Sequence, residues 1–178
     1  MTSAQAGIAE AEASQPATRS RTIVWSDPGE LAAAGAGLSG LELFTAIAEG
    51  ELPPPPMAVL MRMKPVEWGP DRAVFEGEPA EEHYNPIGVV HGGYTATLLD
   101  SAMGCAVHTT LPAGAGYTTL SLEVKFVRPT TTETNRVRAE ADVVHRGRTQ
   151  ATAEGRLVAA DTGKLIAHAT TTCLILGA

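Results

Sequence analysis

The most regular helical pattern of the chain lies between residues 93 and 110. Apolar residues recur there at the three- and four-residue spacing of one helix face, at Leu99, Ala102, Met103, Ala106 and Val107. Small residues fill much of the remaining surface, so several neighbouring elements can approach this helix closely. The pattern therefore predicts a long helix buried at the centre of the fold.

Alternation of apolar and polar residues predicts strands on both sides of this helix. Two strands precede it, over residues 57–67 and 73–79, and four follow it, over 117–128, 135–146, 148–160 and 164–176. In the first of these four, one buried face is expected to hold Leu120, Leu122, Val124 and Phe126. Turn residues separate successive strands, so we expect an antiparallel meander. One long helix and six strands predict an α+β fold in which a curved sheet wraps around the helix.

The chain before the first predicted strand has a different character. Residues 1–22 are small and polar without a sustained period, and they predict a mobile tail. Residues 31–50 favour a short amphipathic helix capped by Ser39, and the prolines at 53–56 favour an extended connector. We therefore expect a flexible or unassigned extension over 1–37, a helix and connector over 38–56, and the main domain over 57–178.

Composition narrows the class of protein. The chain has 178 residues, which suits one globular domain, and acidic residues outnumber basic ones by 20 to 13, giving a net charge of −7. The electric field of a chain with this negative charge repels phosphate backbones, which argues against nucleic-acid binding. The sequence has neither a secretory leader nor an apolar run of about 18 residues, so we expect a cytoplasmic protein that does not span a membrane. Cys105 and Cys173 lack the paired spacing of a metal site, and no metal is expected.

The candidate chemistry begins where the long helix starts, at His91, Gly92 and Gly93. Unpaired backbone N–H groups at a helix start point at any carbonyl or anion nearby, and acyl transfer needs such donors for its oxyanion. Glycine there also lets a substrate approach the main chain. The alternative is that the two glycines only permit a tight turn into the helix.

Two further polar residues flank this point. Asp100 lies about two turns into the helix, and it is either a nucleophile or general base, or an ordinary surface acid. Asn85 stands before a proline, where it is either a turn former or a substrate contact. His108, at the other end of the helix, is expected to complement the helix dipole.

Basic residues gather at the turn Arg146, Gly147 and Arg148, and Arg128 and Lys125 on the preceding predicted strand can be grouped with them. They either contact the phosphates of a nucleotide-like ligand or form a solvated strand edge. The chain has no G-x-S-x-G elbow, no phosphate-binding glycine loop and no metal-ligand spacing. Serine-based and metal-based hydrolysis therefore lack a motif.

The combination of these segments resembles a known family, the hotdog-fold acyl-CoA thioesterases of the phenylacetic acid degradation (PaaI-like) type. The resemblance extends from about Leu38 to Leu176 and rests on NPIGVVHGGYTATLLDSA, GYTTLSLEVKFVRP and VHRGR. Six residues separate Asn85 from His91 and nine separate His91 from Asp100, as in that family. The resemblance implies a hotdog fold and hydrolysis of acyl-CoA to free acid and CoA.

The resemblance also implies roles for individual residues. Asp100 would attack the thioester or activate water, the Gly92 N–H would polarise the carbonyl, and Asn85 and His91 would position the reacting groups. Thr119 would help to hold the water, with Thr118 as the register alternative. Further implied contacts to the substrate or its CoA are Gly93, Arg128, Arg146, Gly147 and Arg148. No cofactor is implied, because CoA is part of the substrate.

The resemblance further implies a homo-oligomer, a dimer or a homotetramer built as a dimer of dimers. Asp100 of one subunit would face Asn85, His91 and Gly92 of the other, so the site would lie at the interface. The acyl group is expected to be aromatic or of medium length. Two alternatives remain open: a non-catalytic acyl-CoA sensor on the same fold and, less well matched to these residues, a hydratase.

Overall fold

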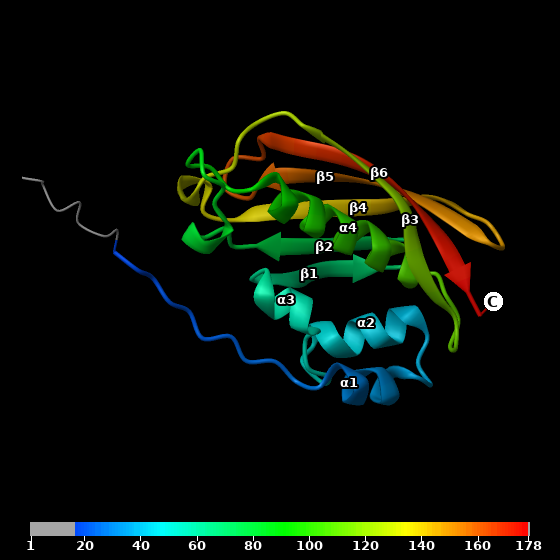
Figure 1. The fold of residues 1–178 in the computed structure, drawn as a ribbon. Coiled ribbons are helices and arrows are strands. Elements are labelled where there is room, and N and C mark those ends of the chain that lie inside the picture. The colour runs from blue at the N-terminus through cyan, green and yellow to red at the C-terminus, as the bar shows by residue number, and fades with distance from the viewer. Residues whose placement is uncertain (1–16, 178) are drawn as a thin grey trace, which may run out of the picture.

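A computed structural model describes residues 17–177 of the protein. Six antiparallel strands form one sheet that curves around the long helix α4, Gly92–His108 (Figure 1). In their order across the sheet the strands are β1 (Met63–Gly69), β2 (Arg72–Gly77), β4 (Val137–Arg146), β5 (Gln150–Ala159), β6 (Leu165–Leu176) and β3 (Gly116–Phe126). The predicted α+β fold, with a curved sheet around one central helix, is confirmed. No helix among the described residues is long and apolar enough to cross a bilayer.

The core lies between α4 and the concave face of the sheet. Leu98, Leu99 and Met103 are fully buried there, and each contributes about 1.5–3 kcal/mol through the burial of its side chain. The opposing strands present small buried residues, namely Ala139, Ala141, Ala151, Ala153 and Ala167. These small side chains let the helix approach the sheet closely, as the predicted central position requires.

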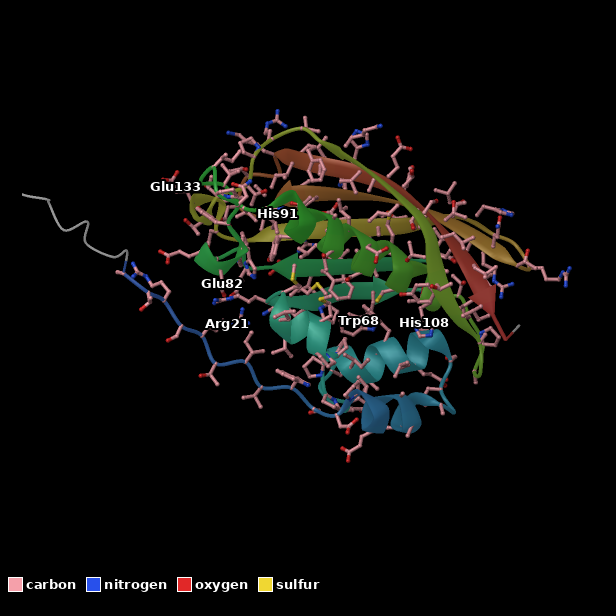
Figure 2. The ribbon with its side chains drawn as sticks, viewed as in Figure 1. Arg21, Trp68, Glu82, His91, His108 and Glu133 are labelled. Atoms are coloured by element: carbon pink, nitrogen blue, oxygen red, sulfur yellow. The ribbon has the colours of Figure 1, made fainter. Side chains whose placement is uncertain are left out.

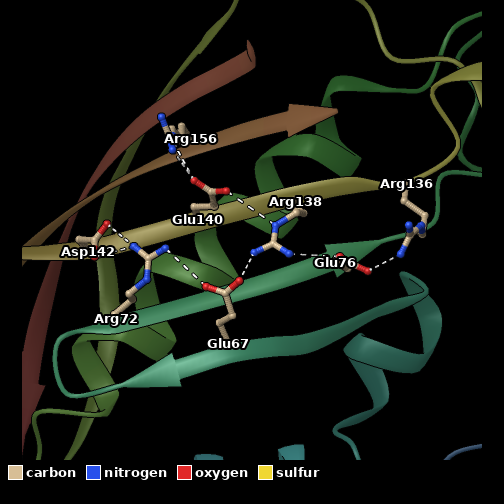
Figure 3. Close-up of polar contacts among 8 residues, drawn as sticks. All are labelled: Glu67, Arg72, Glu76, Arg136, Arg138, Glu140, Asp142 and Arg156. Carbon is tan, nitrogen blue, oxygen red and sulfur yellow. Dashed lines mark hydrogen bonds and ion pairs between the residues drawn. The ribbon is translucent and has the colours of Figure 1, made fainter. Parts of the chain in front are cut away.

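The convex face of the sheet is polar instead (Figure 3). Ion pairs cross it between β1, β2, β4 and β5, such as Arg72 with Asp142 at 2.9 Å and Arg156 with Glu140 at 2.7 Å. Exposed pairs of this kind contribute about 0–1 kcal/mol each, so they add little stability. The apolar cavity and the start of α4 described below lie on the opposite, helix-bearing side.

Strand β3 departs from its prediction. The face expected to be buried is largely exposed: Leu120 is 52% and Phe126 is 56% accessible. The reason is position, because β3 is the edge strand, hydrogen-bonded only to β6. Alternation identifies a face that needs a cover, but within the described chain no element fully covers this one.

Two short helices, α2 (Gly40–Ala48) and α3 (Pro56–Leu60), lie beside β1, and a third, α1 (Pro28–Gly35), lies on the outer side of α2 (Figure 1). The predicted cap of α2 is confirmed, since Ser39 and Glu42 form a reciprocal capping box. Helix α1 was not predicted: it lies within residues 1–37, which were expected to be a flexible or unassigned extension, and Asp27 caps it with Pro28 at its first position. The prediction of a strand from residue 57 was wrong over 57–60, because these residues belong to α3. Pro56 occupies the first position of this helix, where a missing N–H costs nothing.

Of the predicted tail over residues 1–22, positions 1–16 lie outside the described residues. Farther along it, Arg21 donates a hydrogen bond to the carbonyl oxygen of Val59 at 2.8 Å and pairs with Glu82 at 2.8 Å (Figure 2). This segment therefore contacts the end of α3 and the turn that precedes α4.

Candidate functional site

The start of α4 combines a side-chain cap with a free backbone donor. The Nδ1 atom of His91 accepts a hydrogen bond from the Gly93 N–H at 2.8 Å, and His91 lies exposed at this end of the helix (Figure 2). Gly92 is the first helical residue, so its N–H has no acceptor within the helix. The result is a backbone donor, supported by the helix dipole, that is available to a carbonyl oxygen.

The structure explains both glycines at this point. A Cβ on Gly93 would lie 2.8 Å from the His91 ring, so the cap requires glycine there. A Cβ on Gly92 would lie 3.2 Å from the ring of Phe126, at the end of β3. The tight-turn explanation therefore holds for Gly93, while Gly92 keeps the main chain open next to an exposed aromatic ring.

Asn85 stabilises the turn that leads into α4. Its Oδ1 atom accepts hydrogen bonds from the N–H groups of Ile87 at 3.0 Å and Val89 at 3.4 Å. Asn85, Gly92 and Arg128 line one hollow of about 320 Å³. We refer to Asn85, His91 and Gly92 as the donor half-site, because the structure gathers these three predicted residues at the start of α4.

Asp100 lies on the same helix, eight residues after Gly92, which corresponds to roughly 12 Å along the axis. The hydroxyl of Thr119 on β3 donates a hydrogen bond to Asp100 Oδ1 at 3.0 Å. Thr118 is exposed, so of the two neighbouring threonines it is Thr119 that contacts the carboxylate. None of the ion pairs in the described chain involves Asp100. We refer to Asp100 and Thr119 as the carboxylate half-site.

An apolar cavity of about 490 Å³ opens beside this carboxylate. Its lining includes Asp100, Cys105 and Tyr117, together with residues of α2 and the proline run. Burial, with the negative charge of Asp100 as a second cause, raises the pKa of the Cys105 thiol to about 12. Burial also raises the pKa of Tyr117. Both groups stay protonated at neutral pH, which leaves Asp100 as the candidate base or nucleophile of the cavity.

The basic residues expected to bind phosphate lie at two ends of the sheet. Arg128 borders the hollow of the donor half-site and donates to the carbonyl oxygen of Leu165. Arg146, Gly147 and Arg148 form the turn between β4 and β5 at the opposite end (Figure 1). The register of the strands places Ala139 on β4 opposite the end of β3. Arg146 lies roughly 24 Å from Ala139 along β4. One chain therefore does not bring these arginines together.

The sequence reasoning missed the wall of the cavity. Phe44, Ile47 and Leu52 line it, and so do Pro53, Pro54 and Pro55. The signal was the apolar side of the α2 segment followed directly by prolines, which the pattern alone placed outside the domain. Only the packing of α2 against the sheet shows that this segment reaches Asp100.

Comparison with known proteins agrees with this arrangement. A family model described as the thioesterase superfamily matches residues 87–166. Acyl-coenzyme A thioesterase 13 from Mus musculus is 33% identical over 110 residues, which cover 62% of this chain and 77% of that protein.

Solved structures show the same likeness. A phenylacetic acid degradation-related protein from Ralstonia eutropha JMP134 is 30% identical with a TM-score of 0.67, over 74% of this chain and 98% of that one. A variant of the phenylacetic acid degradation protein PaaI from Thermus thermophilus is 31% identical with a TM-score of 0.61, over 67% of this chain and 98% of that one. Fold, motif spacing and relatives together lead to one conclusion: the chain belongs to the thioesterase superfamily and is a hotdog-fold, PaaI-like thioesterase.

Proposed function

We propose that the protein hydrolyses acyl-CoA thioesters and that Asp100 is the catalytic carboxylate. The observation that carries this proposal is the position of Asp100, which is held by Thr119 at 3.0 Å and borders an apolar cavity. The cavity suits a hydrocarbon acyl group, and the carboxylate suits activation of the group that attacks its carbonyl carbon. A relative named for acyl-coenzyme A hydrolysis supports CoA as the thiol.

The proposed reaction needs an electrophilic and a nucleophilic component. The Gly92 N–H donates to the thioester carbonyl oxygen and stabilises the negative charge that develops there. Asp100 either takes a proton from water as the water attacks, or attacks the carbonyl carbon itself before water releases the acid. In both cases the carbon–sulfur bond breaks, and the CoA thiolate leaves and takes up a proton. Asn85 and His91 support the donor by shaping the turn and cap that hold Gly92.

These two components are too far apart within one chain. Gly92 and Asp100 are separated by roughly 12 Å along α4, whereas both must come within about 3 Å of the reacting atoms. We therefore propose that a complete site combines the donor half-site of one subunit with the carboxylate half-site of a second copy. The protein would act as a homodimer or as a dimer of dimers.

Strand β3 supports this assembly because it touches both half-sites. Thr119 near its start holds Asp100, and Phe126 at its end lies against Gly92. Its outer edge is unpaired within the described sheet, and it exposes Leu120, Leu122, Phe126 and Val127. If two β3 edges pair antiparallel about a two-fold axis near Leu122, Thr119 of one copy comes opposite Phe126 of the other. The same operation brings each Asp100 towards the partner's Gly92.

The same symmetry bears on the CoA phosphates. Arg128 lies at the donor end of the sheet, and the turn Arg146–Arg148 lies at the other end. Antiparallel pairing places the turn of one subunit at the end where Arg128 of the second subunit lies. We propose that these arginines hold the CoA phosphates as charge-assisted donors from two chains.

A thiol-release assay with purified protein and a panel of acyl-CoAs tests the proposal. We expect Asp100→Asn to lower turnover by about 10²–10⁴-fold, the usual effect of losing a positioned base, with the fold intact. Glu154→Gln, which neutralises an exposed carboxylate of β5, is the matched control and should retain full turnover. Acyl-CoA that raises the melting temperature without any thiol release would replace the enzyme proposal with the sensor alternative.

A further inference from the structure

We infer that the segment 44–55, through α2 and the proline run, determines which acyl groups the enzyme accepts, and that it selects uncharged hydrocarbon chains of medium length. This inference rests on the proposed function, since it concerns the substrate of the same site. The cavity beside Asp100 is bounded on one side by α4 and β3 and on the other by this segment. An acyl group whose carbonyl lies at Asp100 therefore extends towards α2.

The lining of the cavity fits hydrocarbon. Phe44, Ile47, Leu52 and the three prolines 53–55 contribute apolar surface. Lys64 is the one charged side chain besides Asp100 in the lining, and it is exposed to solvent. A charged acyl terminus placed against Phe44, Ile47 and Leu52 would be costly to bury, because these side chains offer no partner for its charge.

The size of the cavity indicates chain length. Its volume of about 490 Å³ lies within the range of sites that enclose a whole small molecule. Since a liquid water occupies roughly 30 Å³, the space holds on the order of ten groups of methylene size. An acetyl group would leave most of it unfilled, whereas a medium-length chain would fill it.

The wall is fixed in place, so it can discriminate between substrates. Phe44 packs edge-on against Trp68 and Phe75, with ring centroids 6.1 Å and 5.7 Å away. The Trp68 indole N–H donates to the Thr45 hydroxyl at 3.0 Å, which ties α2 to β1. The N–H of Leu52 donates to the carbonyl oxygen of Ala46 at 3.0 Å, and the prolines that follow have fixed φ angles. A wall held this way cannot easily expand around a longer chain.

This wall lies outside the residues that the family model matches. The family match covers residues 87–166, which include Gly92, Asp100 and Thr119, whereas the wall lies before residue 87. The proposed chemistry therefore lies within the matched residues. Selection of the acyl group, as we infer it, depends on a segment before them.

The test is a profile of kcat/KM against saturated acyl-CoAs from butyryl-CoA to hexadecanoyl-CoA. In the wild-type enzyme kcat/KM should rise by about fourfold per methylene until the cavity is full. Ile47→Phe, which takes up the space of roughly one methylene, should lower kcat/KM for decanoyl-CoA relative to butyryl-CoA by about fourfold. Ile47→Ala should move the optimum to longer chains.

Leu41→Phe is the control, because Leu41 is a partly exposed residue of α2 that does not line the cavity, and its profile should match the wild type. The opposite shifts expected of the two Ile47 variants keep the test valid if either one folds poorly. An enzyme that hydrolyses acyl-CoAs with the same profile in both Ile47 variants would overturn this inference alone. A wild-type protein that releases no thiol from any acyl-CoA would overturn the proposed function beneath it.

Discussion

Two inactive variants should restore activity in each other if the site combines residues of two subunits. Asp100→Asn removes the carboxylate, and Gly92→Pro removes the N–H donor. Proline is suited to the first helical position, and His91 before it has φ −60° and ψ 136°, which a residue preceding proline readily adopts. Gly92→Ala is the matched control, since it adds a Cβ against the ring of Phe126, which is 56% accessible and can shift, but keeps the N–H.

The expected magnitude follows from two-fold symmetry. Each variant alone should lose about 10²–10³-fold or more in kcat. When equal amounts assemble at random, about half of the dimers contain one chain of each kind, and one of the two sites in each such dimer is complete. The mixture should therefore show about a quarter of the wild-type activity.

Thiol release after joint refolding or co-expression measures this recovery, with light scattering to verify assembly. A second mixture sharpens the result: wild type with a chain carrying both Asp100→Asn and Gly92→Pro. Both sites of the mixed dimer are then broken, so about a quarter of the activity remains, whereas a site within one chain would retain about half. A first mixture no more active than its parents, with a second mixture at half, would refute the shared site.

Three further predictions follow from single contacts. Thr119→Val should lower kcat about tenfold or more with little change in melting temperature, because it removes the hydrogen bond to Asp100; unchanged kinetics would show that this contact does not serve catalysis. Gly40→Ala should lower the free energy of unfolding by about 1–3 kcal/mol in urea denaturation, since its Cβ would lie 1.8 Å from the carbonyl oxygen of His108; a wild-type midpoint would contradict this packing. Burial lowers the pKa of His108 below 6.5, so the unfolded chain binds a proton that the folded protein does not, and the free energy of unfolding should fall as the pH drops through about 6.5. His108→Gln should flatten this fall, and an equally steep dependence in that variant would exclude His108 as its source.

The sequence predicted the elements whose patterns are long and whose partners lie within the chain. The helix over 93–110 and the four strands after it were recovered to within a few residues, because their apolar faces contact one another. The prediction failed over 57–60, where α3 is too short for a helical period to appear and proline signals both a helix start and an extended connector. It also failed for the exposed face of β3, since periodicity cannot tell a face covered by its own chain from one left for another chain to cover.

The candidate site shows the same division. A local feature such as the His91 cap can be derived from neighbouring residues, because the bond it makes reaches only to Gly93. The hydrogen bond from Thr119 to Asp100 joins residues 19 positions apart, and only the fold brings them together. The wall at Ile47 is farther still from Asp100 in the sequence, and no spacing rule relates the two.

The arrangement of the cavity has a consequence for how such an enzyme changes its substrate. The donor half-site and Asp100 depend on α4, which is packed into the core. Thr119 depends on β3, which lies at the edge of the sheet. The α2 wall contacts this core through a few anchors, chiefly Phe44 and the bond between Trp68 and Thr45. Substitutions between these anchors alter the shape of the cavity without moving the carboxylate or its hydrogen-bond donor. Acyl preference can therefore diverge among relatives that keep the same proposed chemistry.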